Sequence, residues 1–399
     1  MKISLIQPGR NNLKYLKWSY DSIRKNQGNH DVEICVADDF SNDGTWDWCQ
    51  DMMDSDPNFK AIRNEGPTRL GHTILYDRLV NEVASHDVCM IYHADMYLCP
   101  GAIDSIEWNL RENTIVSLTR IEPPLHPPGP EKILQDFGIE PEEFNEENLL
   151  NYLQESSTER IHKTTDGIFA PWAFWKKDFQ EIGGHDPLYA PQSKEDSDIF
   201  NRFQLNGIKF IQTWEGCVYH MTCRGSRFAD GAQRNPNGEV FMKNRETDEW
   251  LAQNQKSTRN FIRKWGHFCK HDKFMKPIIP SKYNIGFVIA SCNTSLLHAL
   301  EPWCDAIYID IDHSEYIERE QPNTQFDLDS KIFSVHAEKD NDIEVFMNGN
   351  TFNQVDYQYI QQLSEIIGDS GELGTFNLGN LEITINNLKR CEKNLIKVS

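Results

Sequence analysis

Residues 32–45 read VEICVADDFSNDGT, and this stretch predicts the unit from which the fold is built. An apolar strand ends in Asp38 and Asp39, a turn of polar residues follows, and a helix begins near Thr45. Helix capping explains the Ser and Asp side chains of the turn, but it does not explain two consecutive acids at the end of the strand. Two carboxylates there can accept hydrogen bonds from a base N–H and a ribose hydroxyl, so the stretch predicts a nucleotide-binding turn.

The same alternation of short apolar runs with amphipathic runs extends through the first hundred residues. The apolar runs are residues 3–6, 32–37, 61–62 and 88–92. Repeated strand–helix units favour a mostly parallel sheet flanked by helices, which is an α/β fold. Because open α/β sheets bind ligands at the carboxyl ends of their strands, we expect functional residues at 7–11, 38–45 and 93–97.

The composition limits the classes of function. The chain has 399 residues, which is longer than a domain with a single hydrophobic core usually is, so two domains are expected. A formal net charge of −21 argues against binding to nucleic acid phosphates or to anionic lipid surfaces. We find no apolar run long enough for a signal peptide or a membrane span, which predicts a cytoplasmic protein. The ten cysteines form no Cys-x-x-Cys pair and are expected to be reduced thiols.

Breaks in the pattern predict the domain boundaries. We expect a first domain at residues 1–270, a linker with two prolines at 271–282, and a smaller C-terminal α/β or α+β domain of unknown role at 283–399. The proline-rich stretch 122–130 belongs to an insertion at about 121–165. This insertion is either a lid or acceptor-side wall over the sheet, or a decorative loop.

A second stretch, residues 89–100, carries a candidate metal site. It reads CMIYHADMYLCP, so that His93, Ala94 and Asp95 follow an apolar strand. A divalent ion held against phosphates needs only one or two protein ligands, and a histidine ligand favours Mn²⁺ over Mg²⁺. A structural histidine is the alternative for His93, whereas Asp95 is predicted to bind the metal.

A third stretch offers a general base. Gly183 and Gly184 permit close backbone approach to a ligand, and Glu195 and Asp196 begin a helix with an apolar inner face. The helix dipole alone favours carboxylates in a first helical turn. An attacking hydroxyl also needs an acid held near the sugar, and Asp196 is the candidate for that role.

A fourth stretch follows the last apolar strand of this region. That strand ends at His220, which could complete the shell of a metal ion. Arg224 and Arg227 come shortly afterwards and could neutralise a departing diphosphate. A structural histidine and two solvated arginines are the alternative for this stretch taken alone.

In this order the stretches resemble the GT-A fold glycosyltransferases, particularly the family-two type, over roughly residues 1–228. That family opens with a strand and a Pro-x-Arg-Asn-like turn, which Gln7-Pro8-Gly9-Arg10-Asn11 resembles. Its Asp-Asp-x-Ser-x-Asp-Gly-Thr turn is matched from Asp38 to Thr45 without a gap, and His93-Ala94-Asp95 stands where the family has Asp-x-Asp. Its later motifs are similar to Gly183–Asp186, Glu195–Gly207 and His220.

The resemblance implies a metal-dependent glycosyltransferase that moves a sugar from a nucleotide-diphosphate donor, most often a UDP sugar, to an acceptor hydroxyl. It implies that Asp95 and His220 hold Mn²⁺ or Mg²⁺, and that Asp196 deprotonates the acceptor in an inverting displacement. The residues expected around the donor are Gln7, Pro8, Arg10, Asp38, Asp39, Arg69, His93, Ala94, Asp95, Trp172, Gly184, Glu195, Arg224 and Arg227. The chain departs from the family pattern at His93, which replaces the first acid of Asp-x-Asp, and at Arg69, where the basic residue is shifted.

Two other functions fit the same residues. A retaining glycosyltransferase would share the nucleotide and metal halves of the site, and the anomeric configuration of its product would distinguish it. A non-catalytic saccharide- or nucleotide-binding protein could keep the fold, and the replacement by His93 is compatible with lost activity. Nucleotidyltransferases and Rossmann-type dehydrogenases or methyltransferases are disfavoured, because only Gly9 follows the first strand and no Gly-x-Gly-x-x-Gly pattern is present.

Overall fold

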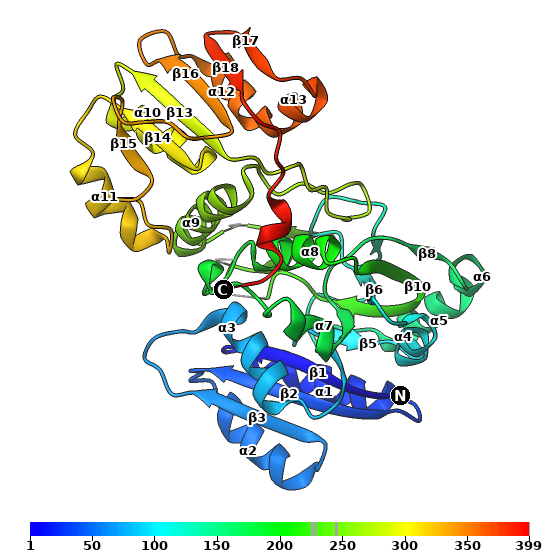
Figure 1. The fold of residues 1–399 in the computed structure, drawn as a ribbon. Helices are drawn as coiled ribbons and strands as arrows, with labels where there is room; N and C mark the ends of the chain where they lie inside the picture. The colour runs from blue at the N-terminus through cyan, green and yellow to red at the C-terminus, as the bar shows by residue number, and fades with distance from the viewer. Residues whose placement is uncertain (225–226, 228–229, 244–245, 399) are drawn as a thin grey trace. The chain divides into compact units, whose positions relative to one another are not determined.

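The computed structural model describes residues 1–224, 227, 230–243 and 246–398, which form two compact units (Figure 1). Unit 1 comprises the described parts of Met1–Ala252 together with His271–Pro277 and Val398. Unit 2 comprises Gln253–Lys270 and Ile278–Lys397. Among the described residues, no helix has the length and the apolar character needed to cross a membrane.

Unit 1 is built on a large sheet whose main strands lie in the order β3-β2-β1-β4-β9-β6-β10-β5. These strands are β1 (Lys2–Gly9), β2 (Asp31–Asp39), β3 (Phe59–Asn64), β4 (Val88–Ile91), β5 (Met96–Leu98), β6 (Thr114–Glu122), β9 (Trp172–Trp175) and β10 (Lys209–His220). Strands β1 to β4 are parallel to one another, and β6 is parallel to β10. Strands β9 and β5 run antiparallel to their neighbours. The predicted mostly parallel α/β sheet is confirmed.

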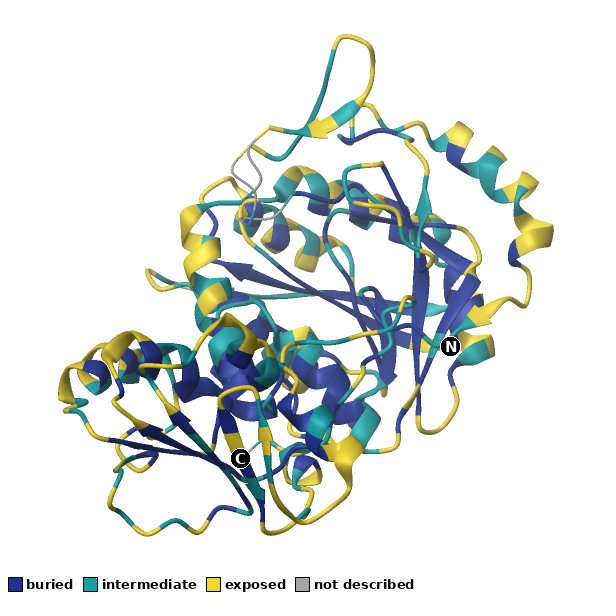
Figure 2. Cartoon of the chain, turned by 90° about the horizontal axis from the view of Figure 1, so that it is seen from above, coloured by how far each residue is buried: buried dark blue, intermediate teal, exposed yellow. Residues whose placement is uncertain are grey.

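Helices cover this sheet because each connection between parallel strands must cross over it. Helices α1 (Leu13–Asn26), α2 (Thr45–Ser55) and α4 (Ala102–Asn109) share one apolar core with β1, β2, β4 and β6. Helix α3 (Gly71–Arg78) packs against β1 and β2, while α7 (Lys176–Glu181) and α8 (Glu195–Leu205) follow β9. Figure 2 shows that the central strands are mostly buried, whereas the helices carry both buried and exposed residues.

An insertion between β6 and β9 extends the sheet. It contains β7 (Ile133–Leu134), α5 (Glu146–Glu155), α6 (Ser157–Arg160) and β8 (Thr164–Thr165), and a separate hairpin of β11 (Ala232–Arg234) and β12 (Val240–Met242) follows β10. Strand β7 pairs with β6, and β8 pairs with β10. The Tyr15 hydroxyl of α1 donates to Glu140 Oε2 at 2.8 Å, so the insertion is also tied to the first helix.

The strand register brings the predicted polar residues to one edge of the sheet. Gly9 at the end of β1 lies opposite Asp38 at the end of β2. Strand β4 is parallel to β1, and the turn that holds His93 follows its carboxyl end. His220 at the end of β10 lies opposite Met96, the residue directly after Asp95. Residues that are far apart in the sequence therefore meet at this edge.

Unit 2 has its own sheet, with the strand order β15-β14-β13-β16-β18-β17. The strands are β13 (Ile285–Ala290), β14 (Ala306–Ile309), β15 (Ile332–Ser334), β16 (Ile343–Asn348), β17 (Gly374–Leu378) and β18 (Leu381–Ile385). The first four are parallel, and β17 and β18 form an antiparallel hairpin. One face of the sheet shares an apolar core with helices α10 (Thr294–Leu300), α11 (Ser314–Glu320), α12 (Gln354–Gln361) and α13 (Leu363–Ser370).

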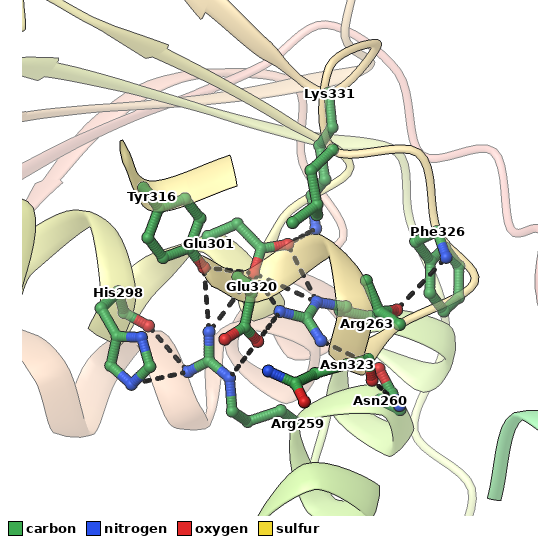
Figure 3. Close-up of polar contacts among 12 residues, drawn as sticks. Arg259, Asn260, Arg263, His298, Glu301, Tyr316, Glu320, Asn323, Phe326 and Lys331 are labelled. Atoms are coloured by element: carbon green, nitrogen blue, oxygen red, sulfur yellow. Dashed lines mark hydrogen bonds and ion pairs between the residues drawn. The ribbon is translucent and has the colours of Figure 1, made fainter. Parts of the chain in front are cut away.

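A buried network of charged side chains fixes the second half of α9 (Asp248–Trp265) within unit 2 (Figure 3). Glu301 is fully buried and accepts hydrogen bonds from Arg263 Nη2 at 2.6 Å, Lys331 Nζ at 2.8 Å and the Tyr316 hydroxyl at 2.9 Å. Arg263 also pairs with Glu320. Buried charges persist in proteins when they are paired and hydrogen-bonded in this way, so the network holds α9 in place.

Glu301→Gln is expected to destabilise unit 2, because it leaves Arg263 and Lys331 buried without their central carboxylate. Breaking a buried ion pair by removing one partner costs about 3–5 kcal/mol. Backbone amides of β13 and β14 should then exchange hydrogen about 10² to 10⁴ times faster than in the parent protein. Glu315→Gln, an exposed change on α11, is the matched control and should leave exchange unaltered. Equal exchange in both variants would contradict the assigned role of the network.

Candidate functional site

Three side chains from two places in the sequence converge at the edge of the large sheet. His93 and Asp95 lie between β4 and β5, and His220 ends β10. One ligand atom from each of the three lies within 4.8 Å of the others, and His220 Nε2 lies 3.4 Å from Asp95 Oδ1. Two imidazoles and one carboxylate suit Mn²⁺ and related transition ions, whereas Mg²⁺ prefers oxygen ligands. These three residues, the metal triad, could hold a divalent ion.

The charges of the metal triad are set by burial and by close neighbours. Burial lowers the pKa of His93 to about 3, so its imidazole is neutral. Burial alone would raise the pKa of Asp95, but His220 beside it lowers that pKa to about 2. For His220, burial opposes the charged form, yet the Asp95 and Glu122 carboxylates raise its pKa to about 9. The raised pKa favours a proton on His220 Nε2, which lies beside the Asp95 carboxylate. A bound metal ion would displace this proton and take its place next to Asp95.

A buried carboxylate that the sequence interpretation did not select lies behind His220. Glu122 ends β6, is 1% exposed, and lies 3.0 Å from His220 Nδ1. Arg120 and Lys132 each have a nitrogen 3.4 Å from its oxygens. A carboxylate on the far nitrogen of a metal-binding histidine fixes the tautomer and the orientation of the ring. Glu122 was visible in the sequence as an acid ending an apolar run, but only the sheet order shows that it reaches His220.

Glu122→Gln is expected to weaken Mn²⁺ binding by about 10- to 100-fold, which is the usual effect of losing such a supporting carboxylate. Calorimetric titration of the full chain with MnCl₂ measures this directly, without any substrate. Glu33→Gln is the matched control, because Glu33 is a buried carboxylate of the same unit that bonds Ser4 and Ser85. That change should lower stability and leave the Mn²⁺ affinity unaltered. An unchanged affinity in Glu122→Gln would exclude the supporting role.

The predicted nucleotide-binding turn at the end of β2 is organised by internal hydrogen bonds. The Asp39 carboxylate accepts from the backbone amides of Leu70 and Gly71, both at 3.0 Å, and from Asn64 Nδ2 at 2.7 Å. Burial opposes the charged form, but these donors lower the pKa of Asp39. Asp39 therefore holds the loop between β3 and α3 against the end of β2.

The other residues predicted on this side lie around the same strand ends. Asp38 is fully buried and pairs with Arg63 Nε at 3.3 Å, and Arg69 Nε lies 3.7 Å from Asp39 Oδ2. Gln7 and Pro8 are buried in β1, and Arg10 is exposed just beyond this strand. Ala94 is buried between His93 and Asp95. The structure thus gathers these residues at the edge that carries the metal triad.

Helix α3 brings a second part of the chain to this edge. Gly71 begins it with φ +75°, and a Cβ there would lie 2.1 Å from the backbone oxygen of Pro191. Only glycine permits this approach, because any other residue would be strained and would collide with the Pro191 backbone. The segment before α8 is thereby packed directly on the start of α3.

Two side chains of α3 that the sequence interpretation missed face the site. The rings of His72 and Tyr76 are 5.7 Å apart, and Tyr76 stacks on His185 at 5.4 Å. Burial raises the pKa of Tyr76, as do the nearby carboxylates of Glu195, Asp196 and Asp95. The charges of Asp95 and of the acids at the start of α8 thus both act on the Tyr76 phenol. The four-residue spacing of His72 and Tyr76, which places them on one helical face, was the available signal.

The start of α8 holds the two acids predicted to act on the acceptor side. Asp196 is exposed, and its Oδ1 accepts from the Ser197 amide at 2.7 Å. Burial and then the Asp196 charge raise the pKa of Glu195 to about 8, so Glu195 keeps its proton at neutral pH. Ser193 and Lys194 precede them with φ of +80° and +72°. Consecutive left-handed residues cost energy and persist where the surroundings impose them, often at functional sites.

Buried bonds beneath α8 support this start. Arg202 is fully buried and donates to Asp198 Oδ2 at 2.7 Å and to the Gly184 carbonyl at 2.6 Å. A Cβ on Gly184 would lie 2.1 Å from Asp77 Oδ2, and His185 Nδ1 lies 2.7 Å from Asp77 Oδ1. The close approach predicted for the glycine pair is thus made to a protein carboxylate of α3.

Three further predicted residues contact the protein itself. Trp172 is 2% exposed and packs against two phenylalanine rings of α8. The Arg224 side chain is almost buried and pairs with Glu140 of the insertion at 3.3 Å. Arg227 pairs with Glu246 at 2.6 Å. Through Glu140 the insertion is thus tied to the segment that follows β10.

Comparison with known proteins finds a family similarity over the first part of the chain. Residues 4–183 match the model of the family described as glycosyl transferase family 2. Similar solved structures are mannosyltransferase PcManGT from Pyrobaculum calidifontis with GDP-Man and Mn²⁺ (16% identity, TM-score 0.40), GalNAc-T7 with UDP, GalNAc and Mn²⁺ (14%, 0.42), and S. aureus TarS 1–349 (13%, 0.38). The matches cover 56%, 55% and 55% of this chain, and the chain spans 57%, 44% and 60% of those structures, respectively. No curated protein matches the sequence.

Proposed function

Because residues 4–183 match the model of glycosyltransferase family 2, we propose that the protein transfers a sugar from a nucleotide-diphosphate donor, a UDP sugar, to an acceptor hydroxyl. The observation that carries this proposal is the convergence of the metal triad with the Asp38–Asp39 turn at one edge of the sheet. Such an edge is where open α/β sheets bind nucleotides.

A divalent ion held by His93, Asp95 and His220 would supply positive charge where the diphosphate departs. Two imidazole ligands favour Mn²⁺ for this site. The turn that ends in Asp39 would form the nucleotide side, and the segment from Pro191 to Asp196 would form the acceptor side. The packing of Pro191 on Gly71, at the start of α3, supports a site that includes both sides.

Asp196 is proposed as the general base of an inverting displacement. The acceptor oxygen bonds to the anomeric carbon, its proton passes to the Asp196 carboxylate, and the bond from the anomeric carbon to the diphosphate oxygen breaks. The exposed position of Asp196 leaves it accessible to an acceptor. The anomeric configuration of the product tests this assignment, because a retained configuration would require a different mechanism.

Calorimetry with UDP and with GDP, each with and without Mn²⁺, tests the proposed function. We expect UDP to bind only when Mn²⁺ is present, because the diphosphate would share the ion with the metal triad. Slow hydrolysis of individual UDP sugars then identifies the donor. If neither nucleotide binds in the presence of Mn²⁺, the proposed activity is wrong.

A further inference from the structure

Unit 2 carries a groove that the proposed donor site does not use. It has a volume of about 390 Å³ and lies on the sheet face opposite helices α10 to α13. Its walls include the apolar side chains of Val288, Val335 and Phe346 and the polar side chains of Asn377, Asn380 and Glu382. A concave apolar surface with a few polar groups is the usual form of a small-ligand site.

The groove lies at the topological switch point of the second sheet. The chain runs from β13 outward through β14 to β15 and then returns to β16 on the other side of β13. In sheets of this kind, ligands bind outside the carboxyl ends of the strands where the order reverses. Ala290 ends β13, Met347 is the penultimate residue of β16, and both line the groove. The topology and the cavity therefore indicate the same place independently.

The register of the six strands arranges this face from apolar to polar. One row of neighbouring positions runs across the sheet: Phe333, Tyr308, Val288, Phe346, Glu382 and Asn377. The apolar end of the row packs with Val335 and Ala337 in a small cluster. The polar end is exposed. The groove therefore places the half-buried ring of Phe346 beside the exposed carboxylate of Glu382 and the exposed amide of Asn377.

The residues that line the groove disfavour an anionic ligand, although Lys339, which donates to the Val335 carbonyl at 2.9 Å, lies beside it. In Rossmann-type sheets the backbone amides after the first strand bind a pyrophosphate, but here Asp310 takes that place. Its carboxylate accepts from the Ser291 amide at 2.7 Å and from the Cys292 amide at 2.9 Å. No lysine or arginine is among the residues that line the groove within the described chain. Residues 281–399 hold 19 acidic and 8 basic side chains, which would repel phosphates and acidic sugars.

We infer that this groove binds a neutral saccharide. This saccharide would be the acceptor of the reaction proposed above, and this second part of the inference rests on the proposed function. Glu382 accepts hydrogen bonds from sugar hydroxyls, and Asn377 both donates and accepts. Asn380 Nδ2 donates to Asp356 Oδ2 at 2.9 Å, which holds its amide in one orientation at the rim. The negatively polarised face of Phe346 packs against the C–H groups of a sugar ring.

An array of neutral oligosaccharides tests this inference. The full chain is applied to hexamers of glucose, mannose, xylose, galactose and N-acetylglucosamine, together with oligogalacturonate as an anionic probe. We expect at least one neutral hexamer to bind and oligogalacturonate not to bind. Glu382→Gln should weaken the binding about tenfold, as expected for losing a hydrogen bond to a charged group. Phe346→Ala should weaken it at least as much.

The matched control is Glu344→Gln, which removes a carboxylate from the same face of β16, two residues from Phe346. This variant should bind like the parent. Glu382 is exposed, so Glu382→Gln tests the groove even if Phe346→Ala fails to fold. The inference is overturned if no neutral hexamer binds, if only oligogalacturonate binds, or if Glu382→Gln binds like Glu344→Gln.

Calorimetry with UDP and Mn²⁺ on the same samples separates the two proposals. If UDP binds but no neutral hexamer does, the groove inference is wrong and the proposed transfer stands. If a neutral hexamer binds in the groove but no nucleotide binds, the saccharide site stands and its acceptor role fails together with the proposed transfer.

Discussion

Asp95→Asn is expected to lower the affinity for Mn²⁺ by more than about 100-fold and to abolish Mn²⁺-dependent binding of UDP. Losing only a supporting carboxylate costs about 10- to 100-fold in metal affinity, and Asp95 is proposed as a direct ligand. It is also the one anionic member of the metal triad, because the other two members are histidines. The variant would hold a doubly charged ion with two imidazoles and a weak amide oxygen.

Thermal unfolding gives an independent measure of this loss. A ligand at 100 times its dissociation constant stabilises a folded protein by about 2.7 kcal/mol. Mn²⁺ at that concentration should raise the unfolding temperature of the parent protein, and it should leave Asp95→Asn almost unchanged. Asp51→Asn, an exposed change on α2, should respond like the parent. If Asp95→Asn binds Mn²⁺ and UDP normally, the metal triad does not serve the nucleotide.

The parts of the site that follow single strands could be predicted from the sequence. An apolar run followed by polar residues marks a strand end, and parallel strands share one ligand-binding edge. These two rules are enough to select Asp38, Asp39 and Asp95 from the sequence alone. The β-α alternation also predicted the parallel strands β1 to β4. In the first hundred residues, the spacing of apolar residues differs clearly between the segments that form helices and those that form strands.

The parts that depend on contacts between distant segments could not be predicted in this way. Glu122 reaches His220 because β6 and β10 are neighbours, and nothing in either segment alone encodes that pairing. The start of α3 meets Pro191 because position 71 is a glycine, and sequence spacing does not show this approach. The ion pair of Arg224 with Glu140 likewise depends on how the insertion folds, which the sequence of neither segment shows.

The two acids at the start of α8 are expected to behave differently when each is changed to its amide. Asp196→Asn should lower turnover by about 10² to 10⁴, which is the usual contribution of a general base. Glu195→Gln should retain most of the activity at neutral pH. The pKa of Glu195 is raised to about 8, so this carboxyl already holds a proton, and glutamine resembles that neutral form. Binding of UDP with Mn²⁺ should be unchanged in both variants, since neither acid belongs to the metal triad.

Turnover and nucleotide affinity measured together decide between a base and a structural role for Asp196. Its Oδ1 bonds only to the adjacent Ser197 among the hydrogen bonds of the described residues, and asparagine keeps an oxygen that can accept from the same amide. The fold of α8 should therefore survive the change, and a loss confined to turnover would follow from the missing base. If turnover falls in Glu195→Gln and not in Asp196→Asn, the proton of the acceptor passes to Glu195, and the start of α8 still supplies the base. If neither change affects turnover, the base lies elsewhere, and the role proposed for Asp196 is wrong.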